Sequence, residues 1–159
     1  MRHPLMVHGN FVANDLDLSG ERQVMILTGA NMAGKSTYLR TVGANVLLAR
    51  MGAPVVAASF ALSDFRLFTS MRASDSLGEG TSYFMAELLR LSQLMDASTS
   101  EPPVLALLDE ILRGTNSVDK EKGSHAFVER LLETETCALV ATHDVSLCTL
   151  SETYPRRVF

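Results

Sequence analysis

The sequence predicts an α/β fold in which helices cover both faces of a mostly parallel sheet. Short, unbroken apolar runs occur at 24–28, 104–108 and 137–142. Between them lie longer segments whose apolar residues recur every three or four positions, as in amphipathic helices. Parallel strands that are buried on both faces have continuous apolar sequences, so this alternation indicates a three-layer arrangement.

In the first half of the chain, strands are expected at 24–28, 54–57 and 65–69. A helix is expected from Lys35 to about Met51 and another from Ser82 to about Met95. The apolar side of the first helix consists of Leu39, Val42, Val46 and Leu47. The apolar side of the second consists of Phe84, Leu88, Leu91 and Met95.

In the second half, a turn-rich connector at 98–103 precedes the strand at 104–108. A helix is expected from Asp119 to about Leu132, then the strand at 137–142, then a last helix at about 145–152. The chain stops at Val158 and Phe159, where another strand would begin. The sequence is therefore interpreted as one domain, 1–159, truncated at its C-terminus.

Composition restricts the class of protein. The 159 residues are 47 % hydrophobic, which favours a folded domain with one core. The net charge of −4 argues against a stand-alone nucleic-acid binder, which usually has a basic surface. Cys137 and Cys148 fit no metal-binding spacing, and no signal peptide or membrane-length apolar run is present. A cytoplasmic protein with no membrane partner is expected.

The segment GANMAGKST follows the first predicted strand and fits the pattern G-x-x-x-x-G-K-[ST] at every fixed position. Glycines let the backbone curl so that its N–H groups face phosphate oxygens, and the next helix adds its positive N-terminal end. Lys35 would reach the β and γ phosphates, and Ser36 would bind Mg²⁺. A chance match in a strand–turn–helix connection is the alternative. The residues predicted here to bind nucleotide are Gly29, Ala30, Asn31, Met32, Ala33, Gly34, Lys35, Ser36 and Thr37.

Two adjacent carboxylates, Asp109 and Glu110, end the strand at 104–108. In a P-loop fold this strand end opens beside the phosphate loop. Asp109 would then help to hold Mg²⁺, and Glu110 would polarise the water that attacks the γ-phosphate. At an ordinary strand end, both carboxylates would simply face solvent.

A third polar group, His143, ends the strand at 137–142 and could donate a hydrogen bond to the γ-phosphate. A capping or surface histidine is the alternative. The guanine-reading motif N-K-x-D does not occur, because Asn116-Ser-Val-Asp119 lacks its lysine. Adenine is therefore the expected base, with ATP and Mg²⁺ as the ligands.

Together these motifs resemble the ATPase domain of the MutS family of DNA mismatch-repair proteins, within the wider group of ABC-type ATPases. The resemblance is carried by four blocks: 28–37, 72–87, 107–119 and 141–144. It implies a P-loop NTPase fold of the ABC type over nearly the whole chain. The family usually has glycine where Ala33 and Leu112 stand.

The resemblance also implies roles for three further residues. Asn31 would position the attacking water near the γ-phosphate, and Phe11 would pack on the adenine ring. Ser82 would contact the γ-phosphate of ATP bound to the opposite subunit. A core or rim aromatic and a helix N-cap serine are the respective alternatives for Phe11 and Ser82. The predicted catalytic residues are thus Glu110, His143 and Asn31, and the predicted metal ligands are Ser36 and Asp109.

The sequence therefore predicts an Mg-dependent ATPase module of a MutS-like protein. In the full-length protein it would form a homodimer around ATP and use hydrolysis to switch a DNA-binding protein between states. DNA would be bound by domains that this chain lacks, and the isolated fragment would turn ATP over weakly. The alternatives are an ATP-binding regulatory module with little hydrolysis, or another ABC-type ATPase; the L-S-G-G-Q motif of transporter subunits is not found.

Overall fold

A parallel sheet organises the chain in a computed structural model that describes residues 1–6, 12–30, 32–71, 83–113 and 116–159. Within these ranges the sheet has four strands, which are β1 (Val24–Leu27), β2 (Arg66–Ser70), β3 (Val104–Asp109) and β4 (Cys137–Ala141). Their order is β1-β4-β3-β2, and every neighbouring pair is parallel. The predicted α/β fold with a parallel sheet is confirmed.

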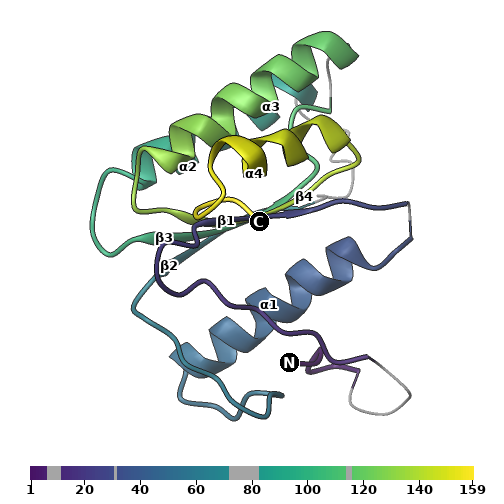
Figure 1. Cartoon of the computed structure of the whole chain (residues 1–159). Helices are drawn as coiled ribbons and strands as arrows, with labels where there is room; N and C mark the ends of the chain where they lie inside the picture. Colours follow the sequence, from purple (N-terminus) through teal and green to yellow (C-terminus); the bar gives the residue numbers. More distant parts are fainter. Residues whose placement is uncertain (7–11, 31, 72–82, 114–115) are drawn as a thin grey trace.

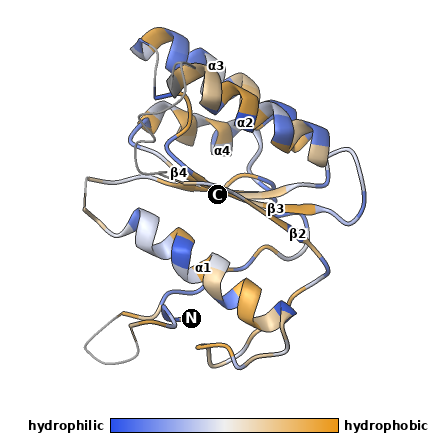
Figure 2. Ribbon diagram, turned by 180° about the vertical axis from the view of Figure 1, so that it is seen from behind, coloured by the Kyte–Doolittle hydropathy of each residue, from blue (hydrophilic) through white to orange (hydrophobic). Residues whose placement is uncertain are grey.

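Helices cover both faces of this sheet (Figure 1). Helix α1 (Lys35–Arg50) lies on one face, together with the N-terminal segment. Helices α2 (Tyr83–Ala97) and α3 (Ser117–Leu132) lie on the other face, with the 3-10 turn η1 (Val145–Thr149) and the short α4 (Leu150–Thr153). The hydropathy colouring shows α1 apart from the other helices, with apolar strands between the two layers (Figure 2). Within the described ranges, no helix has the length and apolar character needed to cross a membrane.

The central strand β3 is buried along its whole length. Leu105 and Leu107 belong to the core cluster on the α1 side, whereas Ala106 and Leu108 belong to the cluster on the opposite side. This alternation follows from the period of two in a strand. Burial of each leucine side chain contributes about 1.5–3 kcal/mol, so a continuous apolar sequence is what this position in the sheet requires.

Helix α1 packs closely against β3. Its buried apolar residues are Leu39, Val42 and Val46, whereas Leu47, which the periodicity placed on the same side, is 51 % exposed. Gly43 allows the close approach, because a Cβ built on it would lie 2.9 Å from Cδ1 of the fully buried Leu107. The helix therefore depends on a residue without a side chain at this position.

The variant Gly43→Ala is expected to lower the free energy of unfolding by about 1 kcal/mol. Overpacking a dense core costs about 1–3 kcal/mol, which outweighs the gain of about 1 kcal/mol in helix propensity. Urea denaturation measures the change. In a Leu107→Ala background the added methyl group has room, so Gly43→Ala should become stabilising there. A Gly43→Ala variant that is as stable as the parent protein would contradict the packing argument.

Three predicted elements differ from the structure. The strand expected at 54–57 does not form: the Val56 N–H donates to Asn45 Oδ1 at 2.8 Å and the Val56 carbonyl accepts the Arg2 N–H at 2.8 Å. These partners replace a sheet ladder. Helix α3 begins at Ser117, two residues before the expected start, because Asn116 caps it by accepting the Asp119 N–H. The predicted last helix is a 3-10 turn followed by one short α-helix.

Helix α2 buries a face that is centred on Leu91 and Leu94, whereas Leu88, predicted on the apolar side, is 37 % exposed. At the other end of the chain, Val158 and Phe159 lie along the outer edge of β1. The Ile26 N–H donates to the Phe159 carbonyl at 2.8 Å, and the Phe159 N–H donates to the Val24 carbonyl at 3.1 Å. Val158 forms a parallel bridge with Val24.

Candidate functional site

The register of the sheet brings the candidate residues to one edge. Leu27 of β1 is paired with Ala141 of β4, and Ala141 is paired with Asp109 of β3. The segments that follow these three residues therefore leave the sheet at the same level. The carboxyl edge of a parallel sheet is where ligands bind in open α/β folds.

The loop between β1 and α1 has a tightly curled backbone. Gly29 and Gly34 have φ values of 143° and 90°, and Met32 has a φ of 65°. Gly34 is the N-cap of α1, and its carbonyl accepts the Tyr38 N–H at 2.8 Å. The left-handed conformations turn the chain directly from the strand into the helix. The Met32 side chain is fully exposed.

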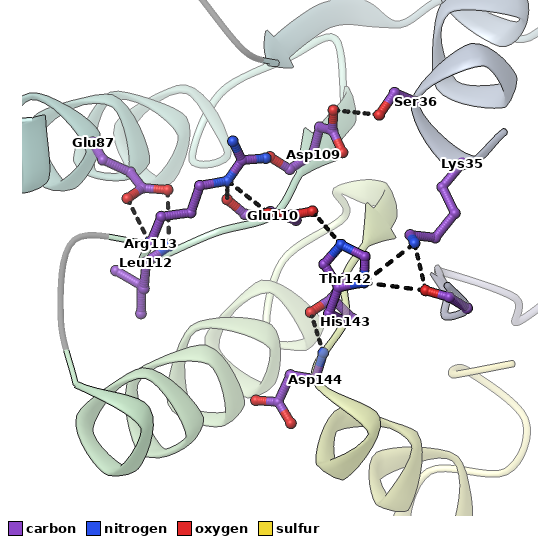
Figure 3. A network of polar contacts seen from close by, with 11 residues as sticks. Lys35, Ser36, Glu87, Asp109, Glu110, Leu112, Arg113, Thr142, His143 and Asp144 are labelled. Atoms are coloured by element: carbon purple, nitrogen blue, oxygen red, sulfur yellow. Dashed lines mark hydrogen bonds and ion pairs between the residues drawn. The ribbon is translucent and has the colours of Figure 1, made fainter. Parts of the chain in front are cut away.

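The Lys35 side chain lies over this loop. Its Nζ donates to the carbonyl oxygens of Gly29 at 2.6 Å and of Ala30 at 3.0 Å. The same Nζ lies 3.5 Å from Nδ1 of His143 (Figure 3). A positive charge is thus held at the mouth of the loop, beside the N-terminus of α1.

Ser36 and Asp109 join the loop to β3. The Ser36 hydroxyl donates to Oδ2 of Asp109 at 2.7 Å (Figure 3). Asp109 is only 6 % exposed, so its carboxylate requires this partner or another one. Hydroxyl and carboxylate oxygens are the ligands that Mg²⁺ prefers. Among the described residues no three His, Cys, Asp or Glu side chains converge into a metal-binding group.

Glu110 directly follows β3 and has a φ of 56°. Its N–H donates to the Ala141 carbonyl at 2.7 Å, which keeps it in line with the end of β4. Its side chain is 13 % exposed, and its carboxylate lies 2.7 Å from His143 Nε2 and pairs with Arg113 Nε at 3.0 Å. The acid is therefore held at the edge of the sheet by partners on both sides (Figure 3).

His143 lies between the loop that carries Gly29 and the carboxylate of Glu110. Its Nδ1 lies 3.1 Å from the Gly29 carbonyl, and its Nε2 faces Glu110. The preceding Thr142 is buried, and its N–H donates to the Leu27 carbonyl at 2.9 Å. Asp144 caps η1 by accepting the Ser146 N–H. These anchors fix the ring at the junction of the loop and β3.

Tyr38 links α1 to the N-terminal segment. Its hydroxyl donates to the Asp15 carbonyl at 2.8 Å. Burial raises the pKa of Tyr38, and the charge of Asp15 raises this pKa further. The phenol therefore stays protonated at neutral pH and keeps this hydrogen bond.

The structure thus brings together the predicted residues Lys35, Ser36, Asp109, Glu110 and His143, with the backbone of Gly29 and Ala30. Met32 and Thr37 are exposed, and Ala33 continues the turn that leads to Gly34. Phe11, Asn31 and Ser82 lie outside the described residues, so their expected roles stay predictions.

Two residues near the site were not predicted from the sequence. Arg113 binds Glu110, and Glu87 of α2 binds the backbone of the loop that carries both. Glu87 stands three residues after Phe84 and four before Leu91, on the side of α2 that packs inward. An acid on the buried side of an amphipathic helix was the signal that could have revealed it.

A surface hollow lies at the opposite edge of the sheet. It is lined by residues at the end of α2, before β3 and after α3, among them Met95, Ser98, Pro103 and Arg130. None of the candidate site residues lines it. Because these lining residues precede β3 and β4, the hollow is separate from the carboxyl edge.

Comparison with known proteins agrees with the sequence motifs. Residues 25–158 match the family described as MutS domain V. The chain is 39 % identical over 157 residues to the DNA mismatch repair protein MutS of Shouchella clausii, a match that covers 95 % of the chain and 18 % of that relative. It is 40 % identical over 163 residues to the protein of the same name from Rhodopirellula baltica, covering 98 % of the chain and 18 % of the relative.

The chain is also 40 % identical over 165 residues to the DNA mismatch repair protein MutS of Dehalococcoides mccartyi. This match covers 98 % of the chain and 19 % of that relative. The chain therefore spans about a fifth of the length of the curated relatives it matches. The family match extends from β1, through the loop and both carboxylates, to the segment after α4. On this evidence the chain belongs to the MutS family and corresponds to its domain V.

Proposed function

We propose that this domain binds ATP with Mg²⁺ and hydrolyses the nucleotide, as a P-loop NTPase module of the ABC type. The observation that carries the proposal is the contact of 2.7 Å between the Ser36 hydroxyl and the Asp109 carboxylate. It joins the G-x-x-x-x-G-K-S loop to the Asp-Glu pair, as the chemistry of phosphoryl transfer requires. Lys35, Glu110 and His143 belong to the same network of polar contacts, on one side of this contact (Figure 3).

The phosphates of ATP would bind over the loop at 29–37. The N-terminus of α1 supplies backbone N–H groups and a positive dipole, which favour anions. The Lys35 ammonium group already lies over the loop, held by the Gly29 and Ala30 carbonyls. On binding, it would exchange these carbonyls for the more strongly charged β and γ phosphate oxygens.

The residues present fit a magnesium ion. Ser36 and Asp109 provide two neighbouring oxygen ligands, and Mg²⁺ sites in nucleotide enzymes combine one or two protein ligands with phosphate oxygens and water. When bound, the ion neutralises charge on the phosphates. Ser36 from the loop and Asp109 from β3 would hold the ion.

Glu110 is the proposed general base. A water molecule attacks the γ-phosphorus, the bond between this phosphorus and the bridging oxygen breaks, and ADP leaves. The proton of the attacking water passes to the Glu110 carboxylate. His143, which lies between Glu110 and the loop, would contact the γ-phosphate. For this step the Glu110 carboxylate must exchange at least one of its present ion-pair partners for water.

The variant Asp109→Asn tests the magnesium part of the proposal. It is expected to lower ATP turnover at saturating Mg²⁺ by at least about tenfold and to raise the Mg²⁺ concentration needed for half-maximal rate, because an amide oxygen is a weaker cation ligand than a carboxylate. Steady-state phosphate release, measured on the natural full-length protein over a series of Mg²⁺ concentrations and with EDTA as the metal-free control, gives both quantities. Turnover that is indifferent to EDTA would contradict the proposal.

In the whole protein, we place this ATPase module in DNA mismatch repair or a related DNA transaction. The support is family membership and the name of the relatives, DNA mismatch repair protein MutS. Two copies would enclose ATP between the Lys35 side of one subunit and the Ser82 side of the other, and hydrolysis would loosen the dimer. DNA would bind through domains outside this chain.

One observation favours a second function, a regulatory module that binds ATP and hardly hydrolyses it. Both oxygens of the Glu110 carboxylate are engaged, one by His143 and one by Arg113. If these pairs persist with ATP bound, no base is available. Equal ATP turnover in the presence and absence of the Glu110 carboxylate would favour this alternative. Membership in the MutS family argues against the alternative of another ABC-type ATPase, such as a transporter subunit.

A further inference from the structure

Glu87 of α2 holds the loop that follows Glu110. Its two carboxylate oxygens accept the backbone N–H groups of Leu112 at 2.8 Å and of Arg113 at 2.9 Å (Figure 3). Glu87 precedes these residues by 25 and 26 positions, so the contact ties two separate elements together. Hydrogen bonds to a charged acceptor are about twice as strong as those between neutral groups.

The loop requires such an external partner. Glu110 and Leu112 have φ values of 56° and 58°, in the left-handed region that disfavours residues with side chains by about 1–2 kcal/mol each. Ile111 and Leu112 are 2 % and 6 % exposed, so an N–H group here that lost its acceptor would be desolvated without compensation. A glycine would adopt the conformation of Leu112 without this strain, so the leucine depends on its surroundings to hold it.

Arg113 connects this anchored loop to the Glu110 side chain. Its guanidinium group donates to the carbonyl oxygens of Asp109 at 2.8 Å and of Glu110 at 3.1 Å, and it pairs with the Glu110 carboxylate. With only 19 % of its side chain exposed, the arginine is held in one position. A continuous chain of contacts thus runs from the Glu87 carboxylate, through the Arg113 backbone and side chain, to the carboxylate of Glu110.

We propose that Glu87 is a positioning residue that sets the orientation of Glu110 and makes it depend on the placement of α2. This inference rests on the proposed ATPase function. According to this inference, the position of α2 determines the position of the Glu110 carboxylate. A shift of α2 would move the backbone N–H groups of Leu112 and Arg113, and with them the Arg113 side chain that pairs with Glu110. A misplacement of about 1 Å in a reacting group can cost about 100-fold in rate.

The isosteric variant Glu87→Gln tests this in the natural full-length protein. A glutamine oxygen can accept one of the two N–H groups, but its NH₂ group faces the other, so one hydrogen bond is lost. We expect kcat to fall by at least about tenfold, while the Kd for ATP, measured by calorimetry with Mg²⁺, changes by less than about twofold. The split between kcat and Kd is the readout that a purely structural role would not produce.

The control is Leu91→Val, which also weakens the packing of α2 but keeps both hydrogen bonds of Glu87 to the loop; Leu91 is a core residue with 5 % exposure. It should lower the melting temperature and keep kcat within about twofold of the parent. A folded Glu87→Gln protein with the parent kcat would overturn the inference, as would a fall in kcat that is matched by an equal loss of ATP affinity.

If Glu87→Gln fails to fold, Arg113→Lys decides the question. Lysine keeps the charge but lacks the planar fork that contacts two carbonyl groups and the carboxylate at once. The same loss of kcat at unchanged Kd is expected, and an unaltered kcat would overturn the inference. The two proposals fail differently: a parent protein that turns over no ATP refutes the proposed function and the inference with it, whereas an active parent with active variants refutes the inference alone.

Discussion

Replacement of Glu110 by glutamine is expected to reduce ATP turnover by at least about 100-fold and to leave ATP binding intact. Loss of a general base typically costs about 10²–10⁴-fold in rate. The amide keeps the size and shape of the side chain, so the neighbouring His143 and Arg113 lose a charged partner but no packing. Binding should persist because the proposed phosphate contacts come from the loop at 29–37, on the other side of the site.

Phosphate release and ATP calorimetry on the natural full-length protein separate these two effects. Glu121→Gln is the matched control, since it removes the same charge from an exposed position on α3. Light scattering adds a third readout, because an ATP-bound dimer should accumulate in Glu110→Gln when hydrolysis is blocked. Turnover equal to that of the parent would favour the regulatory, non-hydrolysing alternative.

The second large effect is expected for Lys35→Ala, which should weaken ATP binding by about 10- to 100-fold. Hydrogen bonds to charged groups contribute about 1.5–3 kcal/mol, and the lysine supplies the ammonium group closest to the loop that is to hold the phosphates. Its present partners, the Gly29 and Ala30 carbonyls, belong to exposed residues, so their loss costs little stability.

Calorimetric titration with ATP and Mg²⁺ measures the affinity of Lys35→Ala, and a thermal melt verifies its fold. Lys122→Ala, an exposed substitution on α3, controls for the loss of one positive charge. A Lys35→Ala protein that binds ATP as tightly as the parent would show that the nucleotide does not occupy this loop.

Strands β1, β3 and β4 could be predicted from the sequence because β3 and most of β4 are buried, β1 is buried or half-buried, and their sequences are correspondingly apolar. The short segment 54–57 has the same composition but no neighbouring strand, since the Asn45 side chain and the Arg2 backbone satisfy its hydrogen bonds. The composition of a segment indicates its burial and its β propensity, but it does not indicate which hydrogen-bond partner each backbone group will have.

Lys35, Ser36, Asp109, Glu110 and His143 could be predicted as one site because they lie at or beyond the carboxyl ends of β1, β3 and β4, and neighbouring parallel strands align these ends at one edge of the sheet. The roles of Glu87 and Arg113 could not be predicted from the sequence. Glu87 binds main-chain N–H groups, which every residue has, so no pairing of side-chain types marks the contact. Arg113 turns back to Glu110 only because two residues before it adopt left-handed conformations.

The contact between Ser36 and Asp109 spans 73 positions of the chain, and that between Lys35 and His143 spans 108. No local fragment contains these partners, so the proposed phosphate site would form only after β4 has paired with both β1 and β3. Under the proposed function, folding and ligand affinity are therefore linked: at a free ATP concentration of 100 times Kd, the native state would gain about 2.7 kcal/mol over the unfolded chain. A destabilising mutation anywhere in β1, β3 or β4 would thus lower the fraction of protein that holds nucleotide, even if every residue proposed to contact phosphate were unchanged.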